Sequence, residues 1–222
     1  MAVADETSVK MPSRWCDLEA FRATPLVREP FPYLIVPRFI PADALAAVEH
    51  DFPRIARAGS FPLPSLTFGA RFQAMIEALR GPEFTGAVEE KFGIDLEGRP
   101  TMVTVRGTSG MRDGHIHTDS VTKLITVLVY MNGKWEPPGG RLRLLRRPDA
   151  LDDVIAEVPP DEGTLLIFKN QPNAWHGYEP FEGIRRVIQL NWVTSHSVVF
   201  WEQTRHRLSA ALKSVAQSRR AF

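Results

Sequence analysis

Hydrophobic residues between positions 100 and 195 are grouped in short apolar or alternating stretches. β-Branched and aliphatic residues dominate these stretches, and Gly, Pro, Asn or Asp residues separate them, which is typical of strands joined by turns. Several such strands in succession predict an antiparallel sandwich or barrel. The predicted strands are Thr101–Arg106, Lys123–Met131, Arg141–Leu145, Leu165–Phe168 and Arg185–Val193.

A different pattern flanks this β region. Apolar residues recur at helical spacing before residue 93 and after residue 198, with one short strand predicted at Tyr33–Val36. The predicted helices that precede the β region are Ala44–Phe52, Arg71–Leu79 and Pro82–Phe92. The chain is therefore expected to be mainly β with flanking helices, an α+β fold. The expected parts are a flexible N-terminal segment with a short helix at 1–30, a single domain at 31–197 with helical support at 41–93 and a β core at about 100–195, and a C-terminal helix at 198–222.

Composition limits the class of protein without giving its function. The 222 residues are 44% hydrophobic and 24% charged, as in ordinary globular domains. A formal net charge of +1 provides no broad positive field, so neither nucleic acid nor a membrane surface is expected as a partner. The single cysteine, Cys16, excludes an intrachain disulfide framework and fits a cytoplasmic location. The basic C-terminal helix is expected to be solvated, and it is the candidate surface for oligomerisation.

Two histidine-containing segments carry candidate chemistry. In GHIHTDS, residues two positions apart would share one side of a strand, so His117 can present its imidazole together with His115 or with Asp119. The second segment, NAWHGY, contains His176, which follows Asp119 by 57 residues and precedes Arg185 by nine.

Two imidazoles and one carboxylate on one face of a metal are the ligands of non-haem Fe(II) oxygenases, and they leave positions open for further ligands. A nearby arginine can bind the distal carboxylate of 2-oxoglutarate through two parallel N–H bonds. A His-x-Asp pattern alone arises by chance. Its combination with a later histidine and arginine makes every member explicable by one mechanism.

The segment from about Pro100 to Ser195 resembles the 2-oxoglutarate- and Fe(II)-dependent dioxygenases, in the branch similar to prolyl 4-hydroxylases. The resemblance is carried by GHIHTD, by LITVLVYMN with Trp135 after it, by GG before RLRL, and by WHGYEP leading to GIR. It implies a double-stranded β-helix, or jelly roll, and an enzyme that uses Fe(II), 2-oxoglutarate and O2, with ascorbate as a supporting reductant. The implied reaction hydroxylates an unactivated C–H bond of a small molecule or a peptidyl residue and releases succinate and CO2.

Carried over position by position, the resemblance implies an iron centre with no further catalytic residue. The implied iron ligands are His117, Asp119 and His176. The implied contacts to 2-oxoglutarate are Arg185, Tyr130, Thr126 and Arg106. Halogenating relatives lack the carboxylate ligand, so the presence of the aspartate favours hydroxylation.

Two adjacent arginines, Arg185 and Arg186, are candidates for the anchor of 2-oxoglutarate. Strand alternation lets only one of them face the site. The polar face and the Gly-x-Arg spacing favour Arg185, whereas Arg186 is in phase with apolar residues that look like sandwich filling, namely Ile188, Leu190 and Trp192. Arg106 stands where such enzymes often carry a tyrosine, and it can contact the co-substrate or bind an anionic substrate.

The same residues allow other classes of function. A cupin site would use His115 and His117 with a following glutamate, but no glutamate follows closely. A non-catalytic metal-binding sensor or binding module would keep the jelly roll without turnover, and an interaction protein would act through the C-terminal helix. The substrate is not predicted. Loops 54–68 and 107–114 are the candidate substrate loops, and the near-neutral charge favours a small molecule over a protein.

Overall fold

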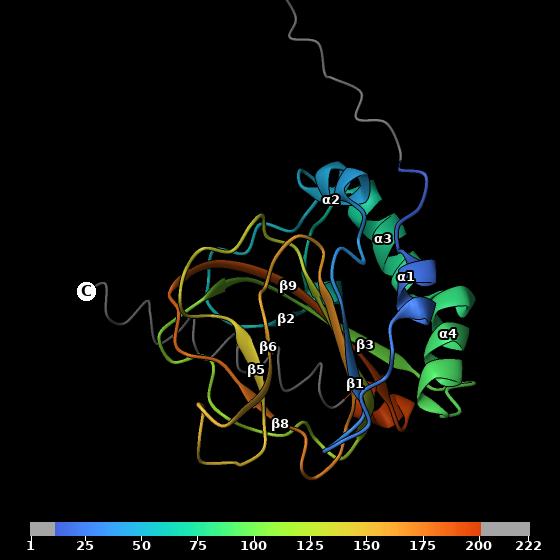
Figure 1. Ribbon diagram of the computed structural model, residues 1–222. Coiled ribbons are helices and arrows are strands. Elements are labelled where there is room, and N and C mark those ends of the chain that lie inside the picture. Colours follow the sequence, from blue (N-terminus) through green and yellow to red (C-terminus); the bar gives the residue numbers. More distant parts are fainter. Residues whose placement is uncertain (1–11, 201–222) are drawn as a thin grey trace, which may run out of the picture.

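Two antiparallel sheets form the centre of the fold in a computed structural model that describes residues 12–200 (Figure 1). The larger sheet has six strands in the order β1-β7-β4-β9-β3-β2, and the smaller has three in the order β6-β5-β8. Most neighbours in the larger sheet are not consecutive in the chain, as in a jelly roll. The strands are β1 (Tyr33–Val36), β2 (Phe61–Pro62), β3 (Thr101–Ser109), β4 (Lys123–Tyr130), β5 (Leu142–Leu145), β6 (Val154–Val158), β7 (Leu165–Lys169), β8 (Trp175–Gly177) and β9 (Gly183–Val193).

Helices gather along one side of the molecule, away from the three-stranded sheet (Figure 1). Pro82 begins α4 at a position where its missing N–H is not needed, and Gly93 ends the helix in the left-handed conformation with φ of 60°. The helical elements are α1 (Leu18–Ala23), α2 (Ala42–Val48), the 3-10 turn η1 (Leu63–Ser65), α3 (Ala70–Arg80) and α4 (Pro82–Phe92). No helix within residues 12–200 is long and apolar enough to cross a membrane.

Side chains alternate across the six-stranded sheet and enter two separate hydrophobic clusters. On one face Val127 and Leu190 pack in the same cluster as Phe72 of α3. On the other face Leu166 packs in a cluster with Leu144 of the small sheet. The large sheet is therefore covered by helices on one side and by the small sheet on the other, and the site lies between the two sheets.

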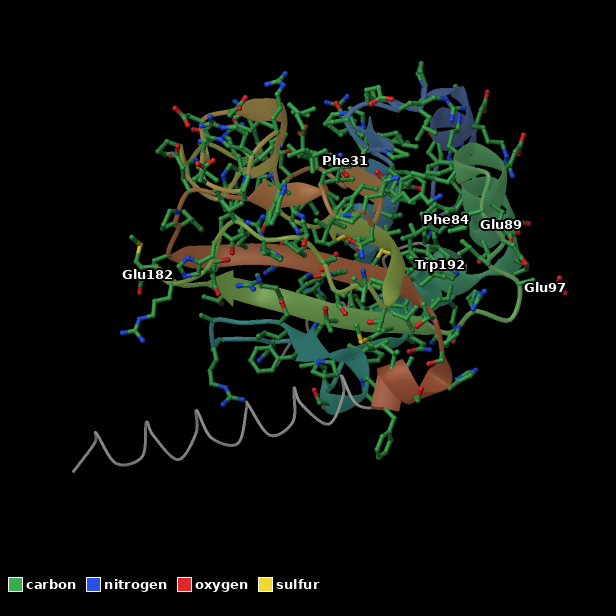
Figure 2. All side chains as sticks on the ribbon, turned by 90° about the horizontal axis from the view of Figure 1, so that it is seen from below. Phe31, Phe84, Glu89, Glu97, Glu182 and Trp192 are labelled. Carbon is green, nitrogen blue, oxygen red and sulfur yellow. The ribbon has the colours of Figure 1, made fainter. Side chains whose placement is uncertain are left out.

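The apolar residues of β9 correct one expectation. Ile188, Leu190 and Trp192 were expected to fill the space between the sheets, but they belong to the helix-facing cluster. The Trp192 ring lies 6.1 Å from the Phe84 ring of α4, and Figure 2 shows both inside the molecule on the helix side. Alternation identifies residues that share a face, but it does not say which layer covers that face.

The five predicted strands of the β region correspond to β3, β4, β5, β7 and β9, with small shifts at their ends. The sequence missed β2, β6 and β8, which have two to five residues each. The short helix expected within 1–30 is α1. The expected C-terminal helix lies almost wholly outside the described residues, which include only its first helical residues, up to residue 200.

Candidate metal and co-substrate site

A two-residue bridge joins the histidine segments. The His117 N–H donates to the His176 carbonyl at 3.0 Å, and the His176 N–H donates to the His117 carbonyl at 2.9 Å. The i, i+2 argument assumed that the GHIHTDS segment is a regular strand. Instead it is irregular, and within residues 12–200 it pairs in strand-like fashion only through this isolated bridge. The two imidazole rings lie with their centroids 4.3 Å apart.

Glycine permits this close approach. Gly114 has φ of +97°, and a Cβ at that position would lie 2.3 Å from the Tyr178 carbonyl oxygen. The Tyr178 N–H donates to the Gly114 carbonyl at 2.9 Å, so the two backbones run directly against each other. A residue with a side chain could adopt this path only with strain.

Asp119 completes a three-residue cluster. One ligand atom from each of His117, Asp119 and His176 lies within 4.8 Å of the others. It is the one such group of histidine, cysteine and acidic side chains found within residues 12–200. His176 is buried, Asp119 is half-buried and His117 is exposed, so the cluster opens to solvent on one side.

The tautomers of both histidines suit a metal. His117 Nδ1 lies 2.8 Å from the backbone oxygen of His115. His176 Nδ1 lies 3.0 Å from the backbone oxygen of Ala174. Because a carbonyl only accepts hydrogen bonds, Nδ1 carries the proton in each ring, and Nε2 keeps the lone pair that a metal needs.

The charges of the cluster favour the same ligand states. Burial, followed by the nearby His117, lowers the pKa of His176 to about 4, so this imidazole is neutral at neutral pH. Burial alone would raise the pKa of Asp119, but Lys123, His176 and two hydrogen bonds outweigh it and lower that pKa. The buried part of the set is therefore the neutral imidazole of His176 and the ionised carboxylate of Asp119.

Asp119 is held from both sides. The Lys123 ammonium lies 2.5 Å from Oδ1, and the Thr126 hydroxyl donates to Oδ2 at 2.5 Å. The Asn191 amide in turn donates to the Thr126 hydroxyl at 2.8 Å. Sequence reasoning missed the roles of Lys123 and Asn191. The position of Asn191 in phase with Arg185 on β9 was the available signal.

Arg185 lies deep in the cavity, only 3% exposed, and its Nε donates to the Gly140 carbonyl at 2.8 Å. Its guanidinium carbon lies 4.2 Å from the centroid of the Tyr178 ring. Arg186 points to the helix side, where it lies 5.5 Å over the Phe52 ring. The structure thus places Arg185 in the cavity and Arg186 on the opposite face of β9.

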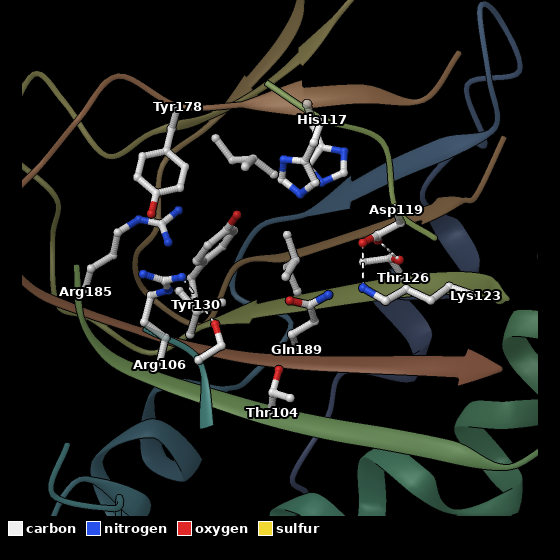
Figure 3. A pocket seen from close by; sticks show the side chains of 15 residues that line it. Thr104, Arg106, His117, Asp119, Lys123, Thr126, Tyr130, Tyr178, Arg185 and Gln189 are labelled. Carbon is white, nitrogen blue, oxygen red and sulfur yellow. Dashed lines mark hydrogen bonds and ion pairs between the residues drawn. The ribbon is translucent and has the colours of Figure 1, made fainter. Parts of the chain in front are cut away.

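Tyr130 lines the same cavity, which has a volume of about 220 Å³ (Figure 3). Its buried hydroxyl has no hydrogen-bond partner among the described residues. Burial raises the pKa of Tyr130 to about 12, so the hydroxyl is protonated and can donate. A buried donor without a partner is unusual, and it marks the place of an acceptor that a ligand would bring.

Arg106 also lines the cavity, from β3. Its Nη1 lies 2.5 Å from Asp113 Oδ2 and 3.5 Å from the Ser109 hydroxyl, and its Nη2 lies 3.3 Å from the Ser60 hydroxyl. These contacts connect it to both predicted substrate loops. The sequence had placed Arg106 near the site, but not between the loops.

These residues fit Fe(II) and 2-oxoglutarate. The donor set is the one that non-haem Fe(II) uses, and one carboxylate leaves positions open for other ligands. Arg185 and the unpartnered Tyr130 hydroxyl offer hydrogen-bond donors to an anion at the buried end of the cavity.

Comparisons with known proteins agree with this geometry. Residues 106–194 match the family model described as the 2OG-Fe(II) oxygenase superfamily. No curated protein matches the sequence. Among solved structures, a Pseudomonas putida prolyl-4-hydroxylase has a TM-score of 0.53 and 19% identity, covering 75% of this chain and 94% of that one. HygX from Streptomyces hygroscopicus, solved with nickel and 2-oxoglutarate bound, has a TM-score of 0.51 and 13% identity, covering 74% and 82%.

Residues 106–194 of this chain are therefore similar to the 2OG-Fe(II) oxygenases, and the cluster of His117, Asp119 and His176 fits the iron that this family uses. The similarity to the solved structures shows a shared fold, which is also that of prolyl 4-hydroxylases. Fold alone does not give the substrate, so the particular reaction has to be argued from the site.

Proposed function

We propose that this oxygenase hydroxylates an unactivated C–H bond of a small molecule, with His117, Asp119 and His176 as the iron ligands. The observation that carries the proposal is the convergence of these three ligand atoms within 4.8 Å. Both imidazoles are oriented by backbone carbonyls, and the carboxylate is ionised and fixed by its neighbours. A carboxylate in this position supports hydroxylation.

The buried end of the cavity is the proposed site of the distal carboxylate of 2-oxoglutarate. The Nε–H of Arg185 donates to the Gly140 carbonyl, so the Nη groups remain to bind the anion. The Tyr130 hydroxyl adds a second donor. The rings of Tyr178 and Tyr130 flank the guanidinium and keep it in place. Arg185 is thus pre-organised before the co-substrate arrives.

Thr126 has a different part in this arrangement. Its hydroxyl donates to Asp119 and accepts from Asn191, so it orients the metal ligand and faces the co-substrate only with its remaining surface. When bound, Fe(II) would activate O2, so that one oxygen atom enters succinate as 2-oxoglutarate loses CO2 and the other enters the substrate as its hydroxyl group. The protein binds, orients and encloses the reactants.

The small cavity supports a small-molecule substrate. Ligand pockets commonly have volumes of about 300–1,000 Å³, and this one has about 220 Å³ and must also hold 2-oxoglutarate. A substrate group that enters it is therefore compact.

Formation of succinate tests the proposal. The purified protein is incubated in air with Fe(II), ascorbate and 2-oxoglutarate, and succinate is quantified with and without a panel of small metabolites. We expect slow succinate formation alone and faster formation with a substrate. A protein that binds Fe(II) and 2-oxoglutarate but never forms succinate would instead be the non-catalytic metal-binding module.

A further inference from the structure

The cavity carries more positive charge than 2-oxoglutarate needs. Three cationic side chains line it, from Arg106, Lys123 and Arg185, against the single lining carboxylate of Asp119. Lys123 is paired with Asp119 at 2.5 Å. Arg106 is paired with Asp113 at 2.5 Å, but Asp113 does not line the cavity. Only one of the two arginines is needed to bind the distal carboxylate of the co-substrate.

The two guanidinium groups lie next to each other beside Tyr130 (Figure 3). Burial, and to a smaller extent Arg106, lowers the pKa of Arg185, whereas the two tyrosines raise it. Like charges this close inside a protein oppose each other unless anions bind between or beside them. Once 2-oxoglutarate compensates Arg185, Arg106 is the remaining arginine that faces the cavity, and Asp113 is paired with it from outside the lining.

Arg106 is positioned nearer the opening than Arg185. Its side chain is 17% exposed, whereas Arg185 as a whole is 3% exposed. Its contacts to Asp113, Ser109 and Ser60 use three of the five N–H groups of a guanidinium, and its Nε makes no hydrogen bond within the part of the chain that the structure describes. A fixed guanidinium with donors to spare is suited to bind a carboxylate.

The neighbouring floor of the cavity is polar. Thr104 on β3 is paired with Gln189 on β9, and both line the cavity beside Arg106. Figure 3 shows their side chains below the candidate metal ligands His117 and Asp119, on the six-stranded sheet. This part of the cavity offers hydrogen-bonding groups to a polar ligand.

We propose that Arg106 binds a carboxylate group of a small-molecule primary substrate, with Thr104 and Gln189 beside it. This inference rests on the proposed function, because it assigns Arg185 to 2-oxoglutarate. The sequence left open whether Arg106 contacts the co-substrate or binds an anionic substrate, and this proposal favours the substrate. Asp113 holds the guanidinium in place before substrate arrives, and at the same time it competes with the substrate for the same charge.

The test uses protein loaded with Zn(II), which prevents turnover, and saturated with 2-oxoglutarate. Trifluoroacetate serves as a carboxylate probe and trifluoroacetamide as its neutral counterpart, and both are followed by fluorine NMR line broadening. The variants are Arg106→Gln, Arg106→Lys and Asp113→Asn. Arg99→Gln is the matched control, since Arg99 contacts the Thr194 carbonyl outside the cavity.

We expect trifluoroacetate, and not the amide, to bind the wild type and the Arg99→Gln variant. Arg106→Gln should weaken this binding about tenfold or more, as for loss of a charge-assisted hydrogen bond. Arg106→Lys should keep part of the binding, and Asp113→Asn should tighten it, because the competing carboxylate is gone. A merely structural role of Arg106 predicts no tightening in Asp113→Asn.

The affinity for 2-oxoglutarate is measured first in every variant by titration calorimetry. A wild type that binds no 2-oxoglutarate contradicts the proposed function itself. A wild type that binds it but shows equal broadening of both probes contradicts only the carboxylate subsite. If Arg106→Gln weakens the binding of 2-oxoglutarate as strongly as the binding of trifluoroacetate, Arg106 belongs to the co-substrate site and the inference is wrong.

Discussion

The two faces of strand β9 have different roles, because one lines the cavity and the other packs against the helices. The face that carries Arg185, Gln189 and Asn191 lies in or beside the cavity, and all three side chains are polar. The opposite face carries Leu190 and Trp192, which are 1% exposed and pack against the helices. Neighbouring residues along one strand therefore serve chemistry and stability separately.

From this difference we expect that substitutions on the cavity face change function with little loss of stability, and that substitutions on the helix face do the reverse. The helix-facing cluster is continuous and apolar, whereas the cavity face combines a second hydrophobic cluster with the hydrogen bonds and ion pairs around Asp119. The comparison would fail if substitutions on the cavity face mainly lowered stability, or if substitutions on the helix face mainly lowered activity.

The largest effect is expected at Asp119. Replacing it with alanine removes the carboxylate ligand and leaves the Lys123 ammonium without its partner, so succinate formation should be abolished. Succinate is quantified after incubation with Fe(II) and 2-oxoglutarate. Asp149→Ala, at an exposed position, is the control and should retain full activity. Turnover by Asp119→Ala would refute the ligand assignment.

The next effect separates the two adjacent arginines. Arg185→Gln removes a buried charge from the proposed co-substrate site and should raise the Kd for 2-oxoglutarate by about 30-fold or more, a loss of about 2 kcal/mol or more. Arg186→Gln should leave this Kd unchanged, because Arg186 lies over Phe52 on the helix side. Titration calorimetry on the Zn(II)-loaded protein measures both. Equal effects would mean that the faces of β9 are misassigned.

Stability should respond in the opposite way. Leu190→Ala removes a side chain from the helix-facing cluster and should lower the free energy of unfolding by about 2–5 kcal/mol. Gln189→Ala loses one hydrogen bond to Asn191, so a cost of about 1 kcal/mol or less is expected. Urea denaturation measures both variants. A larger cost at Gln189 would show that the cavity face also supports the fold.

The smallest effect concerns Cys16, which packs against the helix-facing cluster. Burial raises the pKa of its thiol to about 12, compared with about 8.5 for a free thiol. Since the thiolate is the reactive form, alkylation of the native protein by iodoacetamide should be slow and should rise about tenfold per pH unit from about pH 7 to 10. Mass spectrometry follows the reaction. A plateau above about pH 8.5 would indicate an exposed thiol.

Much of the site was predictable because short motifs of this sequence resemble those of a known family. The spacing of His117, Asp119, His176 and Arg185 identified residues that the fold does bring together. Strand alternation allowed only one of Arg185 and Arg186 to face the site, and the polar face and the Gly-x-Arg spacing favoured Arg185.

Other features depend on tertiary contacts and could not be predicted. Strand β8 has three residues, too few for a periodic signal, yet it positions His176. The hydrogen bonds from Lys123 and Thr126 to Asp119 depend on how the segment before β4 folds back. The layer that covers Leu190 is decided by the packing of helices that lie far away in the sequence.

The central claim is that the cluster of two histidines and one aspartate holds Fe(II) together with 2-oxoglutarate. The most direct measurement adds both to the purified protein under anaerobic conditions and records the visible metal-to-ligand charge-transfer band. We predict that the band forms in the wild type and in His196→Ala, an exposed control, and is lost in His176→Ala. Metal binding without any such band in the wild type would contradict the account.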